Sequence, residues 1–153
     1  MTTIEEAKQY LLQAKYAKQK CIQISYKLAE IKTDSRKLIA MYQMNMGGSG
    51  IKNDINNKII EMETQETKLE TAMIKWTKTQ NEIEHFIDKL ELPQEDEHLR
   101  TLLLLKYVRF ISFTEIAFKL GYSYDYTIKK LHVKSLKIVA KKLKETHKGE
   151  VKM

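Results

Sequence analysis

The sequence predicts an all-α protein, in which a long antiparallel helical hairpin, a coiled coil, is followed by a small bundle of shorter helices. Three observations lead to this fold class. Gly and Pro, which weaken helices, number only five and one in 153 residues. Apolar residues recur every three or four positions over two stretches of roughly 40 residues, the pattern of helices with one buried face. Two breaks in this pattern, a Gly-Gly-Ser-Gly run at 47–50 and Pro93, divide the chain into three parts.

The first two parts, residues 1–46 and 51–91, each carry one sustained seam of the heptad type. The first seam is apolar or aromatic except at one serine: Ala7, Tyr10, Ala14, Ala17, Cys21, Ile24, Leu28, Ile31, Ser35, Leu38 and Tyr42. The second is interrupted by two polar residues: Ile55, Ile59, Met62, Glu66, Leu69, Met73, Trp76, Gln80, Ile83, Ile87 and Leu90. The polar positions either set the register or partner number of the coiled coil or lie at its wet edge.

The Gly-rich run allows the tight reversal that joins two antiparallel helices. Folding the chain there pairs residues whose numbers sum to about 97, which places Trp76 opposite Cys21. Residues 1–92 are therefore predicted to form one domain, an antiparallel helical hairpin. Because a two-helix hairpin has a thin core, we expect it to bind a second copy, most commonly as a dimer, or another protein.

The third part begins with Pro93 and three acidic residues, a composition that favours the first turn of a helix. The predicted helix is heavily apolar and ends near Phe110; its buried side consists of Leu99, Leu102, Leu103, Leu105 and Tyr107. Residues 93–153 form the second predicted domain, which ends in a basic tail.

Two helix caps bracket a glycine in the next segment. Ser112 precedes Glu115 by three residues, which is the spacing of a capping box at the start of a helix. Gly121 suits the left-handed turn that ends a helix, and Ser123 suits the start of another. The expected buried stripes contain Ile116, Ala117 and Leu120, then Tyr126 or Thr127 with Ile128, Leu131, Leu136 and Val139. This arrangement predicts a helix-turn-helix.

The positive charge of the chain is concentrated after this turn. The formal net charge is +7, and residues 126–153, with nine Lys against two acidic residues, carry all of it. In a helix-turn-helix the second helix lies in the major groove of DNA, so double-stranded DNA is the predicted partner. The predicted base-reading residues are Ser123, Tyr124, Asp125, Tyr126, Lys129 and Lys130. The predicted phosphate-contacting residues are Thr127, Lys134, Lys137, Lys141 and Lys142.

Two other interpretations of the same residues stay open. A Lys-rich helix is often only a solvated face. A helical corner with Gly also occurs in bundles that never bind DNA. If these interpretations hold, the chain is a coiled-coil structural or adaptor protein that binds another protein. A further alternative is a DNA-packaging or replication accessory protein, which uses the same module on DNA without regulating transcription.

Residues 102–139, LLLLKYVRFISFTEIAFKLGYSYDYTIKKLHVKSLKIV, resemble region 4 of bacterial sigma factors. With the ending "LH.KSL" they are most similar to phage late-gene transcriptional regulators of the ArpU and RinA type. The resemblance implies a phage or prophage late-gene activator in the cytoplasm of a bacterial host, with RNA polymerase as a further partner. The chain departs from sigma-like recognition helices, which carry Arg near their start, by having Tyr124, Asp125 and Tyr126 there. No other sigma region is visible, so the chain does not resemble a complete sigma factor.

Enzyme chemistry finds no support in the sequence. The four His residues are scattered, with no metal-ligand spacing to one another or to Cys21, and His132 is expected to pack or to lie near a phosphate. The sequence has no phosphate-binding Gly-rich loop, nucleophile elbow or His-Glu-x-x-His motif. We therefore expect no enzymatic activity, no cofactor and no metal.

The location of the protein is predicted from what its first and middle segments lack. The N-terminal residues are polar, so no signal peptide is expected, and a single Cys excludes an intrachain disulfide. The longest apolar run near the middle, Leu102–Leu105, is far shorter than the ~20 residues that span a bilayer. These features predict a soluble cytoplasmic protein without a membrane partner.

Overall fold

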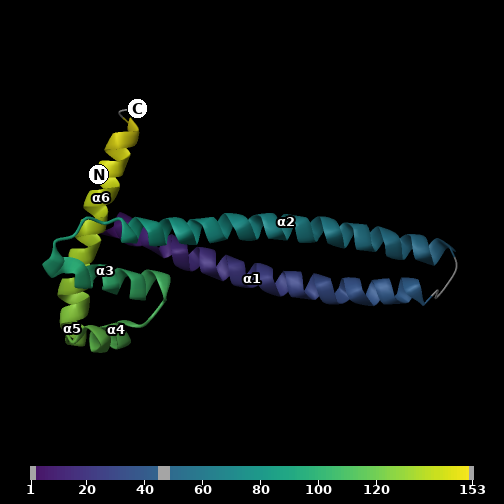
Figure 1. Cartoon of the computed structure of the whole chain (residues 1–153), viewed down its shortest axis with the longest axis horizontal. Coiled ribbons are helices and arrows are strands. Elements are labelled where there is room, and N and C mark those ends of the chain that lie inside the picture. Colours follow the sequence, from purple (N-terminus) through teal and green to yellow (C-terminus); the bar gives the residue numbers. More distant parts are fainter. Residues whose placement is uncertain (1–2, 45–48, 152–153) are drawn as a thin grey trace. The chain divides into compact units, whose positions relative to one another are not determined.

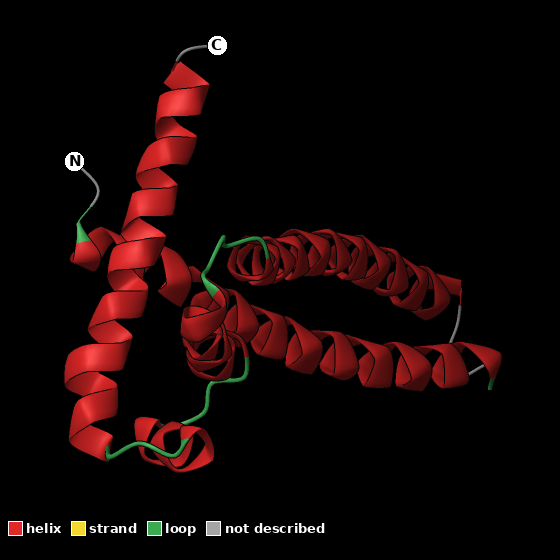
Figure 2. Ribbon diagram, turned by 60° about the vertical axis from the view of Figure 1, so that its left-hand side comes forward, coloured by secondary structure: helices red, strands yellow, loops and turns green. Residues whose placement is uncertain are grey.

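The computed structural model describes residues 3–44 and 49–151, which are almost entirely helical (Figure 1). No strand occurs among these residues, so the predicted all-α fold is confirmed. Two long helices come first, short helices and single turns follow, and a 19-residue helix comes last (Figure 2): α1 Ile4–Gln43, α2 Ser49–Asp88, η1 Gln94–Asp96, α3 Glu97–Leu103, η2 Leu104–Val108, α4 Phe113–Leu120, α5 Tyr124–Tyr126, η3 Thr127–His132 and α6 Val133–Val151. Gly47 and Gly48 of the predicted reversal lie outside the described residues.

The chain divides into two compact units. The hairpin unit contains Lys18–Lys78, and the bundle unit contains Met1–Ala17 together with Thr79–Met153. The bundle unit therefore takes in the beginning of α1 and the end of α2, in addition to everything after Pro93. The boundary predicted at residue 92 marks the point where the apolar repeat of the sequence changes. The two compact units instead reflect which helices pack together in the folded chain.

The hairpin unit is held together along the predicted seam. Its seam residues are buried or half-buried, except for Tyr42, which is 43% exposed near the end of α1. Among the described residues of this unit, Ile24 and Ile55 are the most buried, at 6% and 5% exposed. Cys21 Sγ lies 3.7 Å from Thr77 Oγ1, one position from the predicted pairing with Trp76, so the predicted register is confirmed. The core of this unit is thin, as expected for two helices.

The bundle unit has two apolar clusters. The larger cluster joins the beginning of α1, the end of α2, α3, η2 and the first part of α6 through Ala7, Leu11, Ala14, Ile83, Ile87, Leu90, Leu103, Tyr107, Leu136, Val139, Ala140 and Leu143. At its edge the rings of Tyr10 and Phe86 meet at 5.0 Å in an edge-to-face contact. The smaller cluster, formed by Leu99, Leu102, Ile116 and Leu131, lies between α3, α4 and η3. Helices that are far apart in sequence thus share one core.

Arg100 connects the end of α2 to α3. Its guanidinium donates hydrogen bonds to the backbone carbonyls of Ile87, Asp88 and Leu90, at 2.6, 2.7 and 2.6 Å. The last carbonyls of a helix have no partner within the helix, and a cation there also favours the negative helix end. Glu97 holds the same guanidinium through Nε at 3.0 Å. One side chain therefore caps α2 and sets the position of α3 beside it.

The predicted caps of the helix-turn-helix are confirmed. The Glu115 N–H donates to Ser112 Oγ at the start of α4, at 3.3 Å. Gly121 ends α4 with φ 80°, a left-handed conformation that suits Gly. The N–H of Tyr122 then donates to the Ala117 carbonyl at 3.0 Å, as in a Schellman motif. Ser123 Oγ accepts from the Tyr126 N–H at 3.2 Å, which starts the next helix.

Two π-helical turns, η2 and η3, occur where the sequence predicts ordinary helix. In η2 the Arg109 N–H reaches the Leu104 carbonyl, five residues earlier, at 2.9 Å. Phe110 follows with φ 60°, in the left-handed region that a non-Gly residue rarely adopts. Wide turns of this kind are uncommon and occur often at functional sites.

Candidate nucleic-acid interface

The segment from Tyr124 to Val151 is one uninterrupted helix, made of α5, η3 and α6, and is here called the recognition helix (Figure 1). Its first two turns bring all six predicted base-reading residues to one exposed end of the bundle unit. Tyr124 and Tyr126 remain 50% and 46% exposed, which is high for large aromatic side chains. Ser123 is exposed too, although its hydroxyl oxygen already accepts the capping hydrogen bond.

Two aromatic residues that were not predicted as site residues extend this exposed end. The Tyr122 ring, in the turn, stacks on Tyr126 with 5.3 Å between ring centroids. Phe118 is 88% exposed on α4, on the side opposite the buried Ile116. The sequence signal for Phe118 is an apolar residue that lies outside the buried stripe of its helix.

Thr127 corrects the predicted set of phosphate contacts. The residue is fully buried, and its hydroxyl donates to the Ser123 carbonyl at 2.8 Å. A buried hydroxyl cannot reach a phosphate on the protein surface, so Thr127 serves the fold here. The sequence left Tyr126 or Thr127 as the buried position of this turn, and Thr127 is the one that is buried.

Five lysines form a single row along the exposed side of the recognition helix, called the lysine row: Lys130, Lys134, Lys137, Lys141 and Lys144. Their spacings of four, three, four and three residues keep the side chains on one helix face. The row extends ~21 Å along the helix at ~1.5 Å per residue. Lys144 was not among the predicted residues, whereas Lys142 is half-buried beside Glu91 and Glu145 and lies off the row.

Lys134 differs from the rest of the lysine row because it already has an acidic partner. Its ammonium group lies 2.9 Å from Asp96 Oδ1, in the turn before α3. The hydrogen bond to Asp96 raises the pKa of Lys134. This exposed ion pair contributes little to stability, but it positions the recognition helix against the start of α3. Among the described residues, Lys137, Lys141 and Lys144 have no such ion pair, and Lys141 lies, like Lys142, in a hollow with Glu91 and Glu145.

Behind the recognition helix, Tyr107 of η2 is paired with His132 of η3. The Tyr107 hydroxyl oxygen lies 2.6 Å from His132 Nε2. Burial, and then the charges of Lys8 and Lys106, lower the pKa of His132 to about 4. Burial also raises the pKa of Tyr107. Because the imidazole is neutral at pH 7, its tautomer sets the direction: either the hydroxyl donates to Nε2, or an Nε2–H donates to the hydroxyl oxygen. The expected packing role of His132 is confirmed.

Comparison with known proteins gives no match: no family model fits the chain, and no curated protein or solved structure is similar to it. Within residues 3–44 and 49–151, no group of three or more His, Cys, Asp and Glu side chains is arranged to hold a metal ion. None of the helices in this part of the chain is long and apolar enough to cross a membrane. The geometry of the site is therefore the basis for assigning a function.

Proposed function

We propose that this protein is a sequence-specific DNA-binding transcriptional regulator that acts through its C-terminal helix-turn-helix. The observation that carries the proposal is the lysine row on the recognition helix, which continues directly from an exposed first turn rich in hydrogen-bonding groups. The resemblance to sigma region 4 and to phage late regulators supports a phage or prophage late-gene activator, with RNA polymerase as a further partner. The proposed site of action is the cytoplasm of the bacterial host.

In the proposed complex the first two turns of the recognition helix enter the major groove. The groove is ~12 Å wide and accepts one helix. Asp125 can accept from the amino group of cytosine, and Lys129 or Lys130 can donate to guanine. Tyr124 and Tyr126 offer a hydroxyl group and an apolar ring that can contact a thymine methyl group.

The later part of the recognition helix extends beyond the groove, since the lysine row alone spans ~21 Å. Lys137, Lys141 and Lys144 then meet phosphates at the groove edge and provide affinity that is independent of sequence. This division of roles assigns specificity to the first turns and affinity to the lysine row.

We further propose that the hairpin unit binds a second copy of this chain. The outward face of α2 carries Ile60, Thr64, Thr67, Thr71 and Ile74, spaced by four, three, four and three residues, here called the outer stripe. Each of its three Thr hydroxyls donates to the carbonyl four residues earlier, at 3.0 Å. Because those hydroxyls are satisfied, the Thr methyl groups remain available for an apolar contact. A dimer would present two recognition helices to two half-sites.

An adaptor that binds another protein is the second candidate, and the outer stripe and the bare Phe118 ring favour it. A salt titration separates the two functions. DNA binding through Z phosphate contacts predicts that log affinity falls with log salt with a slope of about −0.9 Z. An adaptor shows no affinity for duplex DNA even at ~50 mM salt, where phosphate contacts are strongest. That result would overturn the proposed function.

The proposal is tested by selecting bound duplexes from a random pool and then measuring affinity for the selected sequence. Replacing Lys137 and Lys141 by Ala is expected to weaken binding to every sequence and to reduce the salt slope by about 0.9 for each lysine. Asp125→Ala and Lys129→Ala are expected to change which sequence is preferred. Lys58→Ala, at an exposed position on the hairpin unit, is the matched control and should leave both properties unchanged. A uniform loss of affinity for Asp125→Ala would show that the reading surface is wrongly assigned.

A further inference from the structure

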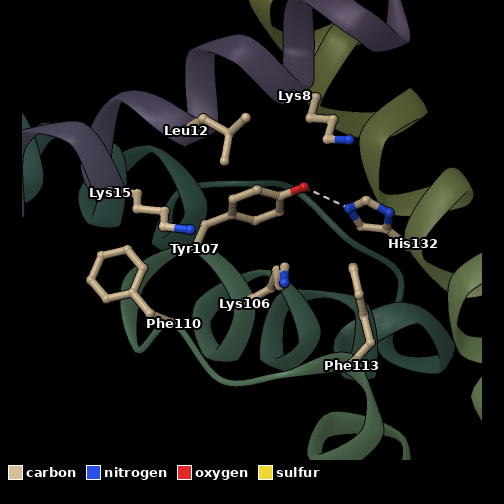
Figure 3. Close-up of a pocket in the computed structure, with 8 residues that line it drawn as sticks. All are labelled: Lys8, Leu12, Lys15, Lys106, Tyr107, Phe110, Phe113 and His132. Atoms are coloured by element: carbon tan, nitrogen blue, oxygen red, sulfur yellow. Dashed lines mark hydrogen bonds between the residues drawn. The ribbon is translucent and has the colours of Figure 1, made fainter.

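A cavity of about 250 Å³ lies in the bundle unit, behind the recognition helix (Figure 3). Four segments line it: the beginning of α1, η2 with the loop that follows, the first residue of α4, and η3. The Tyr107–His132 hydrogen bond forms part of its wall, with the hydroxyl and the imidazole 2.6 Å apart. His132 belongs to the buried side of the recognition helix, so this cavity is separate from the lysine row.

Three lysines, Lys8, Lys15 and Lys106, line the cavity without any carboxylate among the lining residues. In Figure 3 their side chains approach the Tyr107 ring from different sides. Burial, and then the charges of Lys15 and Lys8, lower the pKa of Lys106. Ammonium groups that repel one another in a shared cavity favour the binding of an anion, because the anion neutralises their charge and replaces the water that burial removes. With a neutral imidazole and a protonated tyrosine beside them, the cavity is cationic at pH 7.

The remaining wall of the cavity is apolar and aromatic. Phe113 lies 4.8 Å from the His132 ring and 4.3 Å beneath the Lys106 ammonium group, measured to ring centroids. Phe110 also lines the cavity, and its backbone has φ 60°. A non-Gly residue in that conformation is strained, and such residues cluster at binding sites. A ligand with both an anionic group and a flat ring would use both walls.

We propose that this cavity binds a small organic monophosphate that carries a flat ring, of the chemical class of a nucleoside monophosphate. The phosphate lies among the ammonium groups of Lys8, Lys15 and Lys106. The ring lies against Phe110, on the side of the cavity where Lys15 lies (Figure 3). The cavity is smaller than the ~300 Å³ at the lower end of drug-sized sites, which favours a monophosphate over a larger ligand.

Isothermal titration calorimetry of the full chain at constant ionic strength tests the proposal. The probes are a nucleoside 5′-monophosphate, the same nucleoside without phosphate, inorganic phosphate and sulfate. The nucleoside monophosphate is expected to bind at least ten-fold more tightly than inorganic phosphate or sulfate, and the bare nucleoside is expected not to bind. Equal binding of all anions would show that the ring adds nothing, and no binding at ~10 mM would show that the lysines hold no phosphate; either result overturns the proposal.

Substitutions locate the bound probe. Lys8→Met and Lys15→Met change exposed side chains, so the fold should persist. Each substitution is expected to lower the affinity for the nucleoside monophosphate at least ten-fold. Lys119→Met, also exposed but outside the cavity, is the matched control and should bind as the native chain does. Phe110→Ala is expected to lower the affinity for the nucleoside monophosphate while leaving the affinity for inorganic phosphate unchanged. Binding that survives both lysine substitutions would place the probe elsewhere.

The phosphate group that the cavity binds could also belong to the backbone of DNA. A competition experiment distinguishes a DNA phosphate from the nucleoside monophosphate. In the proposal, duplex DNA does not displace the nucleoside monophosphate, since the lysine row lies on a different side of the recognition helix. Displacement by duplex would reassign the cavity to DNA and overturn the proposal. Because the bound ligand contacts η3 and the first residue of α4, it is expected to change DNA affinity about two-fold. Duplex DNA then changes the affinity for the ligand by the same factor, which is far less than displacement. This last readout alone depends on the proposed function.

Discussion

The hydrogen bond between Tyr107 and His132 ties two π-helical turns together at the level of single residues. Both side chains are buried, and a buried polar group without a partner costs about 1–3 kcal/mol. The neutral imidazole is maintained by burial and by the nearby charges of Lys8 and Lys106, which disfavour a further positive charge. A neutral His132 is therefore part of the folded structure.

Stability is expected to depend on pH through His132. The folded protein lowers the pKa of His132 to about 4, from an unfolded value near 6.5. Between these values the unfolded chain binds a proton that the folded chain does not, so the contribution is complete above pH ~6.5 and is lost as the pH falls toward ~4. The shift corresponds to about 3 kcal/mol at most.

Urea unfolding of the native chain and of His132→Gln, from pH 7 to pH 4.5, measures this contribution. The Gln side chain can still accept the Tyr107 hydrogen bond but does not titrate in this range. The native chain is expected to lose more stability over the range than the variant does, while the contributions of carboxylates appear in both. Parallel stability curves would show that His132 does not titrate as described.

Arg100 organises the structure at the scale of whole elements, because three carbonyls at the end of α2 share its guanidinium. Arg100→Met is expected to lower the free energy of unfolding by about 2–3 kcal/mol, since charged hydrogen bonds are lost and carbonyls are left without donors. Arg100→Lys is expected to recover less than half of this, because one ammonium group cannot reproduce the planar set of donors. Chemical denaturation measures both effects.

The control for Arg100 is Arg109→Lys, at an exposed position where the change should be within ~0.5 kcal/mol. If Arg100→Lys proved as stable as the native chain, a simple positive charge at the helix end would be sufficient. The shared capping of three carbonyls would then have no energetic role.

The long helices and both serine caps could be predicted because their signals are local. Heptad spacing identifies a buried face from one helix alone, and Ser112 or Ser123 caps its own turn. Arg100 could not be predicted, because its partners are 10 to 13 residues away and depend on how the chain turns at Pro93. The π-helical turns were missed for a related reason: they insert an extra residue that only tertiary packing accommodates.

The candidate DNA site was predictable in its exposed part, because charge and helix periodicity place side chains on one face. The correction concerns a buried residue, because Thr127 is in the core. The ion pair of the exposed Lys134 with an acid 38 positions earlier in the chain was also not visible in the sequence pattern. The lysine-lined cavity could not be anticipated at all. Its lysines come from α1 and η2, which lie far apart in sequence and meet only in the folded bundle unit.

At the scale of the whole molecule, the proposed dimer links the hairpin unit to DNA affinity. Ile74→Lys places a charge on the outer stripe, where the native side chain is 71% exposed, so the hairpin itself should keep its helical content. A buried charge at an interface between copies is costly, and the variant is expected to be a monomer by sedimentation equilibrium while the native chain is a dimer.

The same substitution is expected to weaken binding to a two-half-site duplex by at least ten-fold, because the second recognition helix is no longer held at a high effective concentration. The salt slope should fall to about half, since half of the phosphate contacts are lost. Gln65→Lys, exposed on α2 but about 140° around the helix from Ile60, is the matched control and should remain a dimer with native affinity. A native chain that is monomeric at tens of micromolar would contradict the dimer, and an unchanged salt slope in Ile74→Lys would show that each recognition helix binds DNA alone.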